Sequence, residues 1–222
     1  MTISISQSRE TCLAWTGTAV VVDVLRSSTT LCALLASGKK DIRVFGDRES
    51  ALAARRPDDE FFSELEYPPG LRKFDNSPWQ ALHQADKNKP AILVTGAGTK
   101  AQLALSGAER VLAGCFANFS TITEYIKKLG GEVLVVPAAL FNDYHVEDYL
   151  CAQAISEAAL GRAAAAQDAL ESFRRTTRPA EFLELRKENG KNDMALALSL
   201  DALPVLPEIK IRNGFGEVFN AV

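Results

Sequence analysis

Residues 19–38 constrain the fold of this chain more than any other segment, because they predict a strand that leads directly into a helix. Ala19 to Val24 is apolar apart from Asp23, which is typical of a strand buried in a parallel sheet. Thr29 to Ser37 predicts a helix, and Gly38 follows it as a C-cap. A strand followed at once by a helix is the repeating unit of α/β folds. The segment therefore favours an α/β architecture.

The same alternation continues along the chain. Further strands are predicted at Ile42 to Phe45, Ala91 to Thr95, Val111 to Cys115 and Val133 to Val136. Further helices are predicted at Glu49 to Arg55, Ala101 to Leu105, Ser120 to Leu129, 147–171, Pro179 to Lys187 and Asp193 to Leu200. The proline-rich residues 57–80 are expected to be irregular, and Val205 to Phe219 to form an edge strand or a hairpin. We expect a three-layer α/β/α fold with a mostly parallel or mixed sheet.

The chain is long enough to bury one substantial core. It has 222 residues, of which 47% are hydrophobic and 24% charged, and we expect a single α/β domain over residues 1–222. Two segments, which begin near Val22 and near Gly114, share the order strand end, polar loop, hydroxyl residue, helix and glycine. This likeness indicates either a duplication, with pseudo-halves of about 1–90 and 91–222, or only the common pattern of strand–helix units.

Composition argues against several classes of partner. A net charge of −3 speaks against nucleic acid and anionic membrane surfaces, and no apolar stretch approaches the roughly 20 residues of a membrane-spanning helix. The four cysteines form no Cys-x-x-Cys pair and only two histidines are present, so neither a zinc site nor a disulfide framework is indicated. The N-terminus lacks a signal-peptide pattern. We expect a cytoplasmic protein, and the chain's size and alanine-rich helix suggest a homodimer.

Polar residues gather at the end of the first predicted strand. Asp23 and Arg26 stand between the strand and the helix, and the hydroxyl residues Ser27 to Thr30 begin the helix. The crevice beyond the carboxyl end of such a strand is where open α/β sheets bind ligands, and free N–H groups at a helix start suit an oxyanion. Two interpretations fit: a phosphate site with a divalent metal, or a helix capped by Ser28 or Thr29 beside a surface ion pair.

A second polar turn, Thr95 to Ala101, also follows a predicted strand and opens a helix. It fits the Gly-x-Gly-x-x-Ala form of a dinucleotide fingerprint. The acid that binds ribose in such sites is expected about 20 residues further on, where Asn118 stands. Phosphate binding assisted by Lys100, a plain tight turn and NAD binding therefore all stay open.

Two further acidic segments also have two interpretations, a structural role in a turn or at a helix start and a chemical role in catalysis or metal binding. Asp75, Asn76 and Ser77 precede a proline, which favours a turn held by side chains, but Asp75 also suits a metal ligand or a general acid. Glu147 and Asp148 stand in the first turn of a predicted helix, where acids interact favourably with the helix dipole. A carboxylate pair of this kind can also hold Mg²⁺.

Taken together and in order, these motifs resemble the 2-phosphosulfolactate phosphatase family of coenzyme M biosynthesis. The segments that carry the resemblance are Val22 to Thr30, Phe74 to Pro78, Thr95 to Lys100, Gly114 to Asn118 and Glu147 to Ala152. The resemblance implies an α/β/α fold and the Mg²⁺-dependent hydrolysis of a small, acidic phosphate monoester.

The sequence departs from the family pattern at several positions. Leu65 replaces an arginine after Glu64, Ala97 replaces an amide, Lys100 replaces a guanidinium and His145 replaces a serine. Lysine cannot give the planar two-point contact of arginine. Two alternatives to phosphatase activity therefore stay open: a catalytically inactive relative that binds an anionic metabolite, and a nucleotide-dependent oxidoreductase built on residues 96–101.

The phosphatase hypothesis, which rests on the resemblance and on these strand ends, assigns roles to individual residues. The residues expected to hold Mg²⁺ are Asp23, Glu64, Glu147 and Asp148. The residues expected to take part in catalysis are Asp23, Arg26 and Asp75, with Asp75 as acid or base. The residues expected to bind the small anionic phosphate ester are Ser28, Thr29, Asn76, Ser77, Gly98, Thr99, Lys100 and Asn118.

Overall fold

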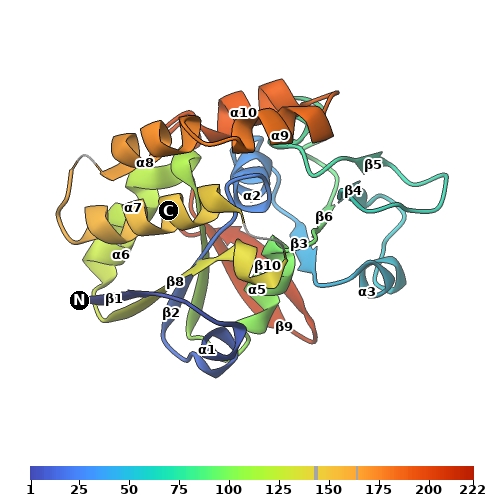
Figure 1. Cartoon of the computed structure of the whole chain (residues 1–222). Coiled ribbons are helices and arrows are strands. Elements are labelled where there is room, and N and C mark those ends of the chain that lie inside the picture. The colour runs from blue at the N-terminus through green and yellow to red at the C-terminus, as the bar shows by residue number, and fades with distance from the viewer. Residues whose placement is uncertain (143–144, 164) are drawn as a thin grey trace.

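The computed structural model describes residues 1–142, 145–163 and 165–222. Figure 1 shows strands in the middle of the molecule, with helices around them. In the described residues the strands are β1 (Thr2–Ile5), β2 (Thr18–Val22), β3 (Ile42–Phe45), β4 (Glu60–Phe62), β5 (Lys73–Phe74), β6 (Ala91–Val94), β7 (Arg110–Gly114), β8 (Glu132–Pro137), β9 (Pro207–Arg212) and β10 (Phe215–Asn220). The helices are α1 (Arg9–Ala14), α2 (Ser27–Ala36), α3 (Arg48–Ala53), α4 (Pro78–His83), α5 (Gly98–Ala104), α6 (Phe119–Leu129), α7 (Val146–Ala159), α8 (Ala165–Arg174), α9 (Arg178–Leu185) and α10 (Gly190–Ala197), with short 3-10 helices η1 (Phe116–Asn118) and η2 (Ala138–Phe141).

The strands form one mixed sheet with the order β1-β8-β2-β7-β9-β10-β3-β6-β4-β5. Strands β1, β8, β2 and β7 are parallel to one another, and so are β3, β6, β4 and β5. The hairpin β9–β10 joins these two parallel blocks, because β9 pairs antiparallel with β7 and β10 pairs antiparallel with β3. Each block contains strands from both 1–90 and 91–222, and the single-domain and pseudo-half assignments stay predictions.

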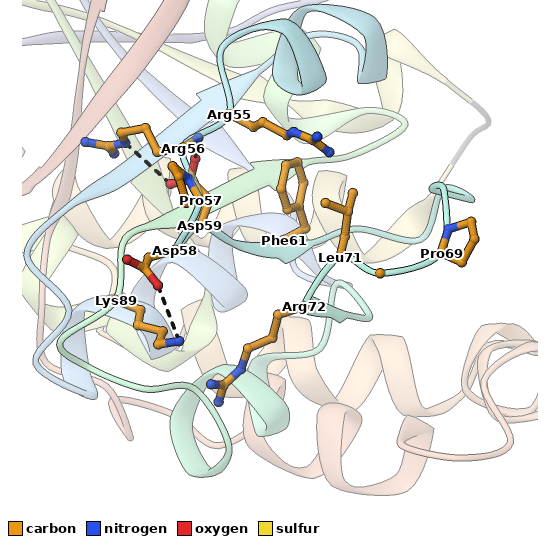
Figure 2. Close-up of a pocket in the computed structure, with 11 residues that line it drawn as sticks. Arg55, Arg56, Pro57, Asp58, Asp59, Phe61, Pro69, Leu71, Arg72 and Lys89 are labelled. Carbon is orange, nitrogen blue, oxygen red and sulfur yellow. Dashed lines mark hydrogen bonds and ion pairs between the residues drawn. The ribbon is translucent and has the colours of Figure 1, made fainter.

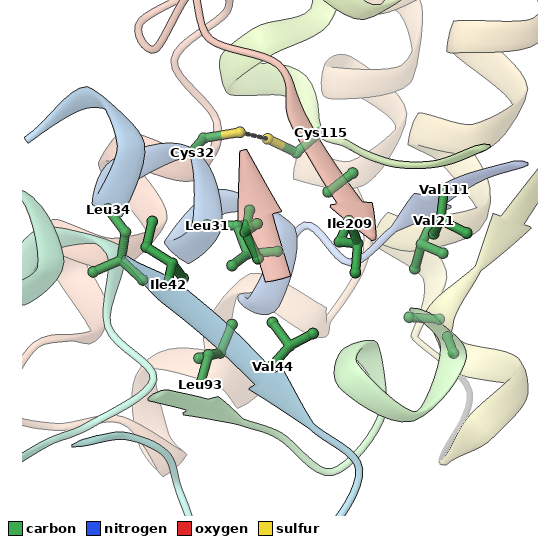
Figure 3. Close-up of a cluster of buried hydrophobic side chains, with 14 of the residues drawn as sticks. Val21, Leu31, Cys32, Leu34, Ile42, Val44, Leu93, Val111, Cys115 and Ile209 are labelled. Carbon is green, nitrogen blue, oxygen red and sulfur yellow. Dashed lines mark hydrogen bonds between the residues drawn. The ribbon is translucent and has the colours of Figure 1, made fainter. Parts of the chain in front are cut away.

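Helices cover both faces of the sheet, and the two faces of β2 are equally apolar. Val20 and Val22 pack with α6, α7 and α8 in one buried cluster. Ala19 and Val21 belong to a second buried cluster with Leu31 of α2, and Figure 3 shows Val21 and Leu31 within it. Successive side chains of a strand point to opposite faces, so a strand between two helical layers needs an uninterrupted apolar run. The expected three-layer α/β fold is confirmed.

The sheet is strongly curved. Strands β2 and β6 are five steps apart in the strand order, which in a flat sheet with a spacing of about 4.8 Å would separate them by about 24 Å. Nevertheless Gly98, just after β6, lies against Asp23, just after β2: a Cβ atom on Gly98 would come closer than 3.0 Å to the Asp23 carboxylate. Curvature therefore brings together the carboxyl ends of strands from both blocks.

The C-terminal segment corrects one expectation. It forms a hairpin, as one alternative predicted, but the hairpin lies in the interior of the sheet rather than at its edge. Val111 of β7 pairs with Ile209 of β9, and Val44 of β3 pairs with Gly216 of β10. The strands also bury Ile209 and Val218 in the core cluster beneath the sheet. An alternating pattern identifies a strand but does not identify its neighbours.

Three other segments differ from expectation. Residues 57–80 are not wholly irregular, because they contain β4, β5 and the start of α4. The predicted helical stretch 147–171 is divided into α7 and α8, and Gly161 stands after α7 with a φ angle of +106°; residue 164 lies outside the described residues. The N-terminal strand β1 has no predicted counterpart, because its side chains are exposed or only half-buried.

No helix among the described residues is both long enough and apolar enough to cross a membrane.

We expect the substitution Gly216→Ala to destabilise the fold by about 1–3 kcal/mol, the usual cost of overpacking a core. A Cβ atom at this position would come closer than 3.0 Å to methyl carbons of Ile209 and Val44. Urea unfolding would measure the loss. The control is Gly46→Ala, whose Cβ would meet Leu103 at an ordinary 3.4 Å. Equal stability of the two variants would contradict tight packing at the hairpin.

Candidate active site

A cavity of about 410 Å³ lies where strands from both parallel blocks end. Asp23 follows β2, Glu64 follows β4, Asn76 follows β5 and Thr95 follows β6, and all four residues line the cavity. The cationic residues that line it are Arg26, Arg178 and Arg186, beside His145. Acids and cations therefore share one cavity at the carboxyl edge of the strands, which is the position that α/β sheets use for ligands.

Asp23 is the most perturbed acid of this cavity. Its side chain is buried, and Oδ1 accepts the N–H of Ser27 at 3.0 Å. Burial raises the pKa of Asp23 from 3.8 to about 7, and the negative charges of Glu64 and Glu147 add to this effect. The carboxylate also lies against Gly98, where a side chain would collide with it. Asp23 is thus a buried acid that forms no ion pair with an arginine or a lysine among the described residues, and the nearby charge of Arg26 does not offset the effect of burial.

Glu64 and Asn76 present buried oxygen atoms at the same cavity. Glu64 Oε1 accepts the N–H of Gly96 at 2.6 Å. Glu64 Oε2 and Asn76 Oδ1 are both buried without a hydrogen-bond partner among the described residues. Such atoms are uncommon because each loses its hydration on burial. The two oxygens indicate that a donor or a cation belongs in this cavity.

Arg26 is a buried guanidinium held by two carboxylates. Nη1 and Nη2 donate to Asp75 at 2.6 and 2.9 Å, and Nη1 also donates to Asp193 at 2.8 Å. Burial opposes the charge of Arg26, but the hydrogen bonds to Asp75 and Asp193 outweigh burial and raise its pKa. Asp193 on α10 is itself fixed, because it accepts the Ser77 hydroxyl at 2.5 Å and the Trp79 N–H at 3.2 Å. Arg26 is therefore a permanently charged and well-oriented donor.

Asp75 is held as an anion by the same contacts. Burial raises its pKa, but the hydrogen bonds and the charge of Arg26 outweigh burial, and the net shift is downward. A carboxyl group with a lowered pKa carries no proton to donate near neutral pH. This geometry favours Asp75 as a residue that orients Arg26, and its predicted role as acid or base stays untested.

Glu147 and Asp148 lie behind the cavity, at the start of α7. Both are buried. Glu147 pairs with Arg178 Nε at 3.0 Å. The two oxygens of Asp148 accept the N–H groups of Val24 at 2.9 Å and Ala139 at 3.1 Å. Burial raises the pKa of Asp148 well above its ordinary value, and the charges of Asp23 and Glu147 raise it further. Asp148 thereby links the ends of β2 and β8.

Several residues predicted to bind substrate use their polar groups within the fold. The hydroxyl groups of Ser28 and Thr29 donate to backbone carbonyl oxygens at 3.1 and 2.8 Å. The Thr99 hydroxyl accepts the N–H of Thr95 at 3.0 Å. The Asn118 side chain accepts one backbone N–H and donates to two carbonyl oxygens. These four side chains are fully buried and shape the loops around the cavity.

Lys100 lies on the far side of the turn that follows β6. It is exposed and lines a separate cavity of about 280 Å³, which shares Leu65, Thr95 and Gly96 with the main one. The lysine is thus a neighbour of the main cavity and not part of its lining. Leu65 adds an apolar surface at the shared wall.

The residues fit a magnesium ion held by two carboxylates. The structure does not gather the four predicted ligands: among the described residues, no three His, Cys, Asp or Glu side chains form a group that could hold a metal. Mg²⁺ commonly takes only one or two protein carboxylates and keeps several waters. Asp23 and Glu64 supply two, and Glu64 Oε2, which has no hydrogen-bond partner among the described residues, is the kind of oxygen that such an ion would satisfy. Glu147 and Asp148 already bind other groups.

A larger cavity, of about 540 Å³, lies apart from these acids, between the loop after α3 and the loop before β5. Figure 2 shows Arg56 directed at Asp59 and Lys89 directed at Asp58. Arg72 pairs with the buried Glu60 at 2.7 Å. Three of the four cations that line this cavity thus have carboxylate partners, and Arg55 is the exception among the described residues. The cavity also lies apart from the acids at the strand ends, so its size does not make it the stronger candidate site.

Helix α9 contributes residues that the sequence analysis does not single out. Arg178, Phe182, Leu185 and Arg186 all line the main cavity. They follow one another at intervals of four, three and one residues, which places them on one helical face. This shared face could have been recognised from the sequence. Asp193 gives no comparable local signal, because its contact with Arg26 joins residues 167 positions apart.

We expect the stability of the metal-free protein to fall as the pH rises from about 4 to about 7. In this range the folded protein retains the Asp23 proton, because its pKa is raised from 3.8 to about 7, while the unfolded chain releases it. Asp23→Asn should flatten this decline and be more stable than the parent at pH 8 in EDTA. Thermal melts across pH would measure both effects.

The matched control for that experiment is Asp58→Asn, which changes an aspartate whose side chain is 75% exposed. Its pH profile should follow that of the parent protein. Parallel profiles for the parent and Asp23→Asn would contradict the perturbed state of Asp23.

Comparisons with known proteins show the family of this chain. A family model described as 2-phosphosulpholactate phosphatase matches residues 4–211. A relative from Symbiobacterium thermophilum, named probable 2-phosphosulfolactate phosphatase, is 32% identical over 198 residues, which are 83% of this chain and 84% of the relative. Two further relatives have the same name and are 28% identical to this chain. The match to the relative from a Synechococcus species covers 86% of this chain, and the match to the relative from Carboxydothermus hydrogenoformans covers 88%. Each match covers 87% of the relative. The resemblance seen in the motifs is confirmed, and the chain belongs to the 2-phosphosulpholactate phosphatase family.

Proposed function

We propose that this protein is a Mg²⁺-dependent phosphatase that hydrolyses a small phosphate monoester carrying further acidic groups, as 2-phosphosulfolactate does. The observation that carries the proposal is the cavity in which the buried acid Asp23 and the half-buried acid Glu64 lie beside the buried guanidinium of Arg26. Membership of the family supports the reaction class and the substrate class. The homodimer and the cytoplasmic location stay predictions.

The residues of the cavity have separate parts in this reaction. Asp23 and Glu64 would hold the metal, which when bound polarises a phosphoryl group and lowers the pKa of water. Arg26 would donate to phosphoryl oxygens and stabilise the charge that builds up there. Asp75 and Asp193 keep the guanidinium of Arg26 in one orientation.

The surrounding residues complete the cavity. The carboxamide of Asn76, whose Oδ1 has no hydrogen-bond partner in the described part of the chain, would orient the substrate. Phe182 lines the cavity and lies 5.9 Å from the Arg26 guanidinium, measured to the ring centroid. Its ring limits the access of water to Arg26, which strengthens electrostatic contacts there.

We expect the purified protein to release phosphate from 2-phosphosulfolactate or 2-phospholactate in the presence of Mg²⁺ and to lose this activity in EDTA. Phosphate release would be measured with a colorimetric assay over a panel of phosphate monoesters. An absence of release across the panel from a folded protein would overturn the proposal. In that case, a rise in melting temperature with the same esters would support the alternative of a catalytically inactive binder, because a ligand that binds only the native state stabilises it.

We expect Asp23→Asn to lower kcat by at least about 100-fold, the scale on which loss of one preorganised electrostatic group reduces turnover. Asn retains an oxygen that can accept the Ser27 N–H, so the far-UV circular dichroism should be unchanged. The exposed variant Asp58→Asn serves as the control and should turn over normally. Near-normal turnover by Asp23→Asn would contradict the role assigned to Asp23.

A further inference from the structure

The main cavity has a wall made by one face of helix α9. Arg178, Phe182, Leu185 and Arg186 line the cavity, and their spacing places them on the same side of the helix. Phe182 anchors this face, because its ring centroid lies 5.9 Å from the Arg26 guanidinium and 6.0 Å from that of Arg178. The helix is thereby fixed against the residues at the end of β2. Arg186, one turn beyond Phe182, is brought to the cavity by this anchor.

The three arginines of the cavity differ in their partners. Arg26 is paired with Asp75 and Asp193, and Arg178 is paired with Glu147. Arg186 makes no ion pair and no side-chain hydrogen bond with a carboxylate among the described residues, although its charge contributes to lowering the pKa of Asp75. Among the described residues, Arg186 is therefore the guanidinium of this cavity that has no carboxylate partner, and we expect its donors to be available to a ligand.

Among the described residues that line the cavity, the cations are Arg26, Arg178 and Arg186, beside His145. Leu65 is apolar, and Lys100 lies in the adjoining cavity rather than in this one. A substrate with a phosphate and a second anionic group needs two positively charged contacts, because an unpaired anion in a cavity is costly to desolvate. Arg26 is assigned to the phosphoryl group, which leaves Arg186 of the α9 wall for the second anionic group.

We propose that Arg186 determines substrate specificity by binding the second anionic group, a carboxylate or a sulfonate, of the phosphate ester. The inference rests on the proposed phosphatase function and extends it to a residue outside the motifs that carry the family resemblance. A guanidinium suits this task because its fork of N–H groups contacts two oxygens of a planar carboxylate or of a sulfonate at once.

The test compares two substrates that differ in the second anionic group. 2-Phospholactate carries a carboxylate, and glycerol 2-phosphate carries neutral hydroxyl groups in its place. Arg186→Gln should raise KM for 2-phospholactate by about 10-fold or more, the scale expected for loss of a charged hydrogen bond, with kcat within about 2-fold of the parent. Its kcat/KM for glycerol 2-phosphate should be unchanged.

The matched control is Lys187→Gln, which removes the same charge from the neighbouring exposed residue. It should leave both substrates unaffected, and Arg186→Lys should restore part of the affinity for 2-phospholactate. An unchanged KM for 2-phospholactate in Arg186→Gln, or equal losses on both substrates, would overturn the inference.

The failure of the proposed function would be recognised separately. If the parent protein releases no phosphate from either ester, the phosphatase proposal fails, and binding alone decides the inference. Thermal melts with 2-phospholactate should then show stabilisation of the parent and of Lys187→Gln but not of Arg186→Gln. Equal stabilisation of all three proteins, or of none, would overturn the role of Arg186.

Discussion

The close approach of Asp23 and Gly98 is the contact on which the site depends. These residues follow strands that are five steps apart in the sheet, so they meet only because the sheet curves. The approach leaves no space for a side chain at position 98. It also removes Asp23 from water, and this burial is the main cause of its raised pKa. The shape of the sheet and the electrostatics of the acid thus have one origin.

Some of the charged side chains around this contact are paired with an opposite charge, and others are not. Arg26 has two carboxylate partners and Glu147 has Arg178, whereas Asp23 and Glu64 share a cavity and form no ion pair with an arginine or a lysine among the described residues. Removing one partner of a buried ion pair is strongly destabilising, so each of these paired groups depends on its partner. The unpaired acids raise the energy of the folded state and make it favour a positively charged ligand.

Much of this arrangement could be predicted from local patterns, and the remainder could not. The strand before Asp23 and the helix after it follow from apolar periodicity, and family motifs identify Asp23, Arg26 and Glu64. The inward direction of the hydroxyls of Ser28 and Thr29 does not follow, because a hydroxyl at a helix start has the same local pattern whether it contacts the backbone or a ligand. The interior place of β9 and β10 depends on pairing with β7 and β3, which are distant in the chain.

The hairpin between the two parallel blocks also has a consequence for biosynthesis. Residues 207–220 supply the two strands that join β7 to β3. On a ribosome, these residues emerge after the eight other strands that the structure describes, so neither block can complete its inner edge before residues 207–220 have been synthesised. Each block then exposes an unpaired strand edge, which is a template for intermolecular association. Nascent chains of this protein therefore depend on the late arrival of β9 and β10 for protection from aggregation.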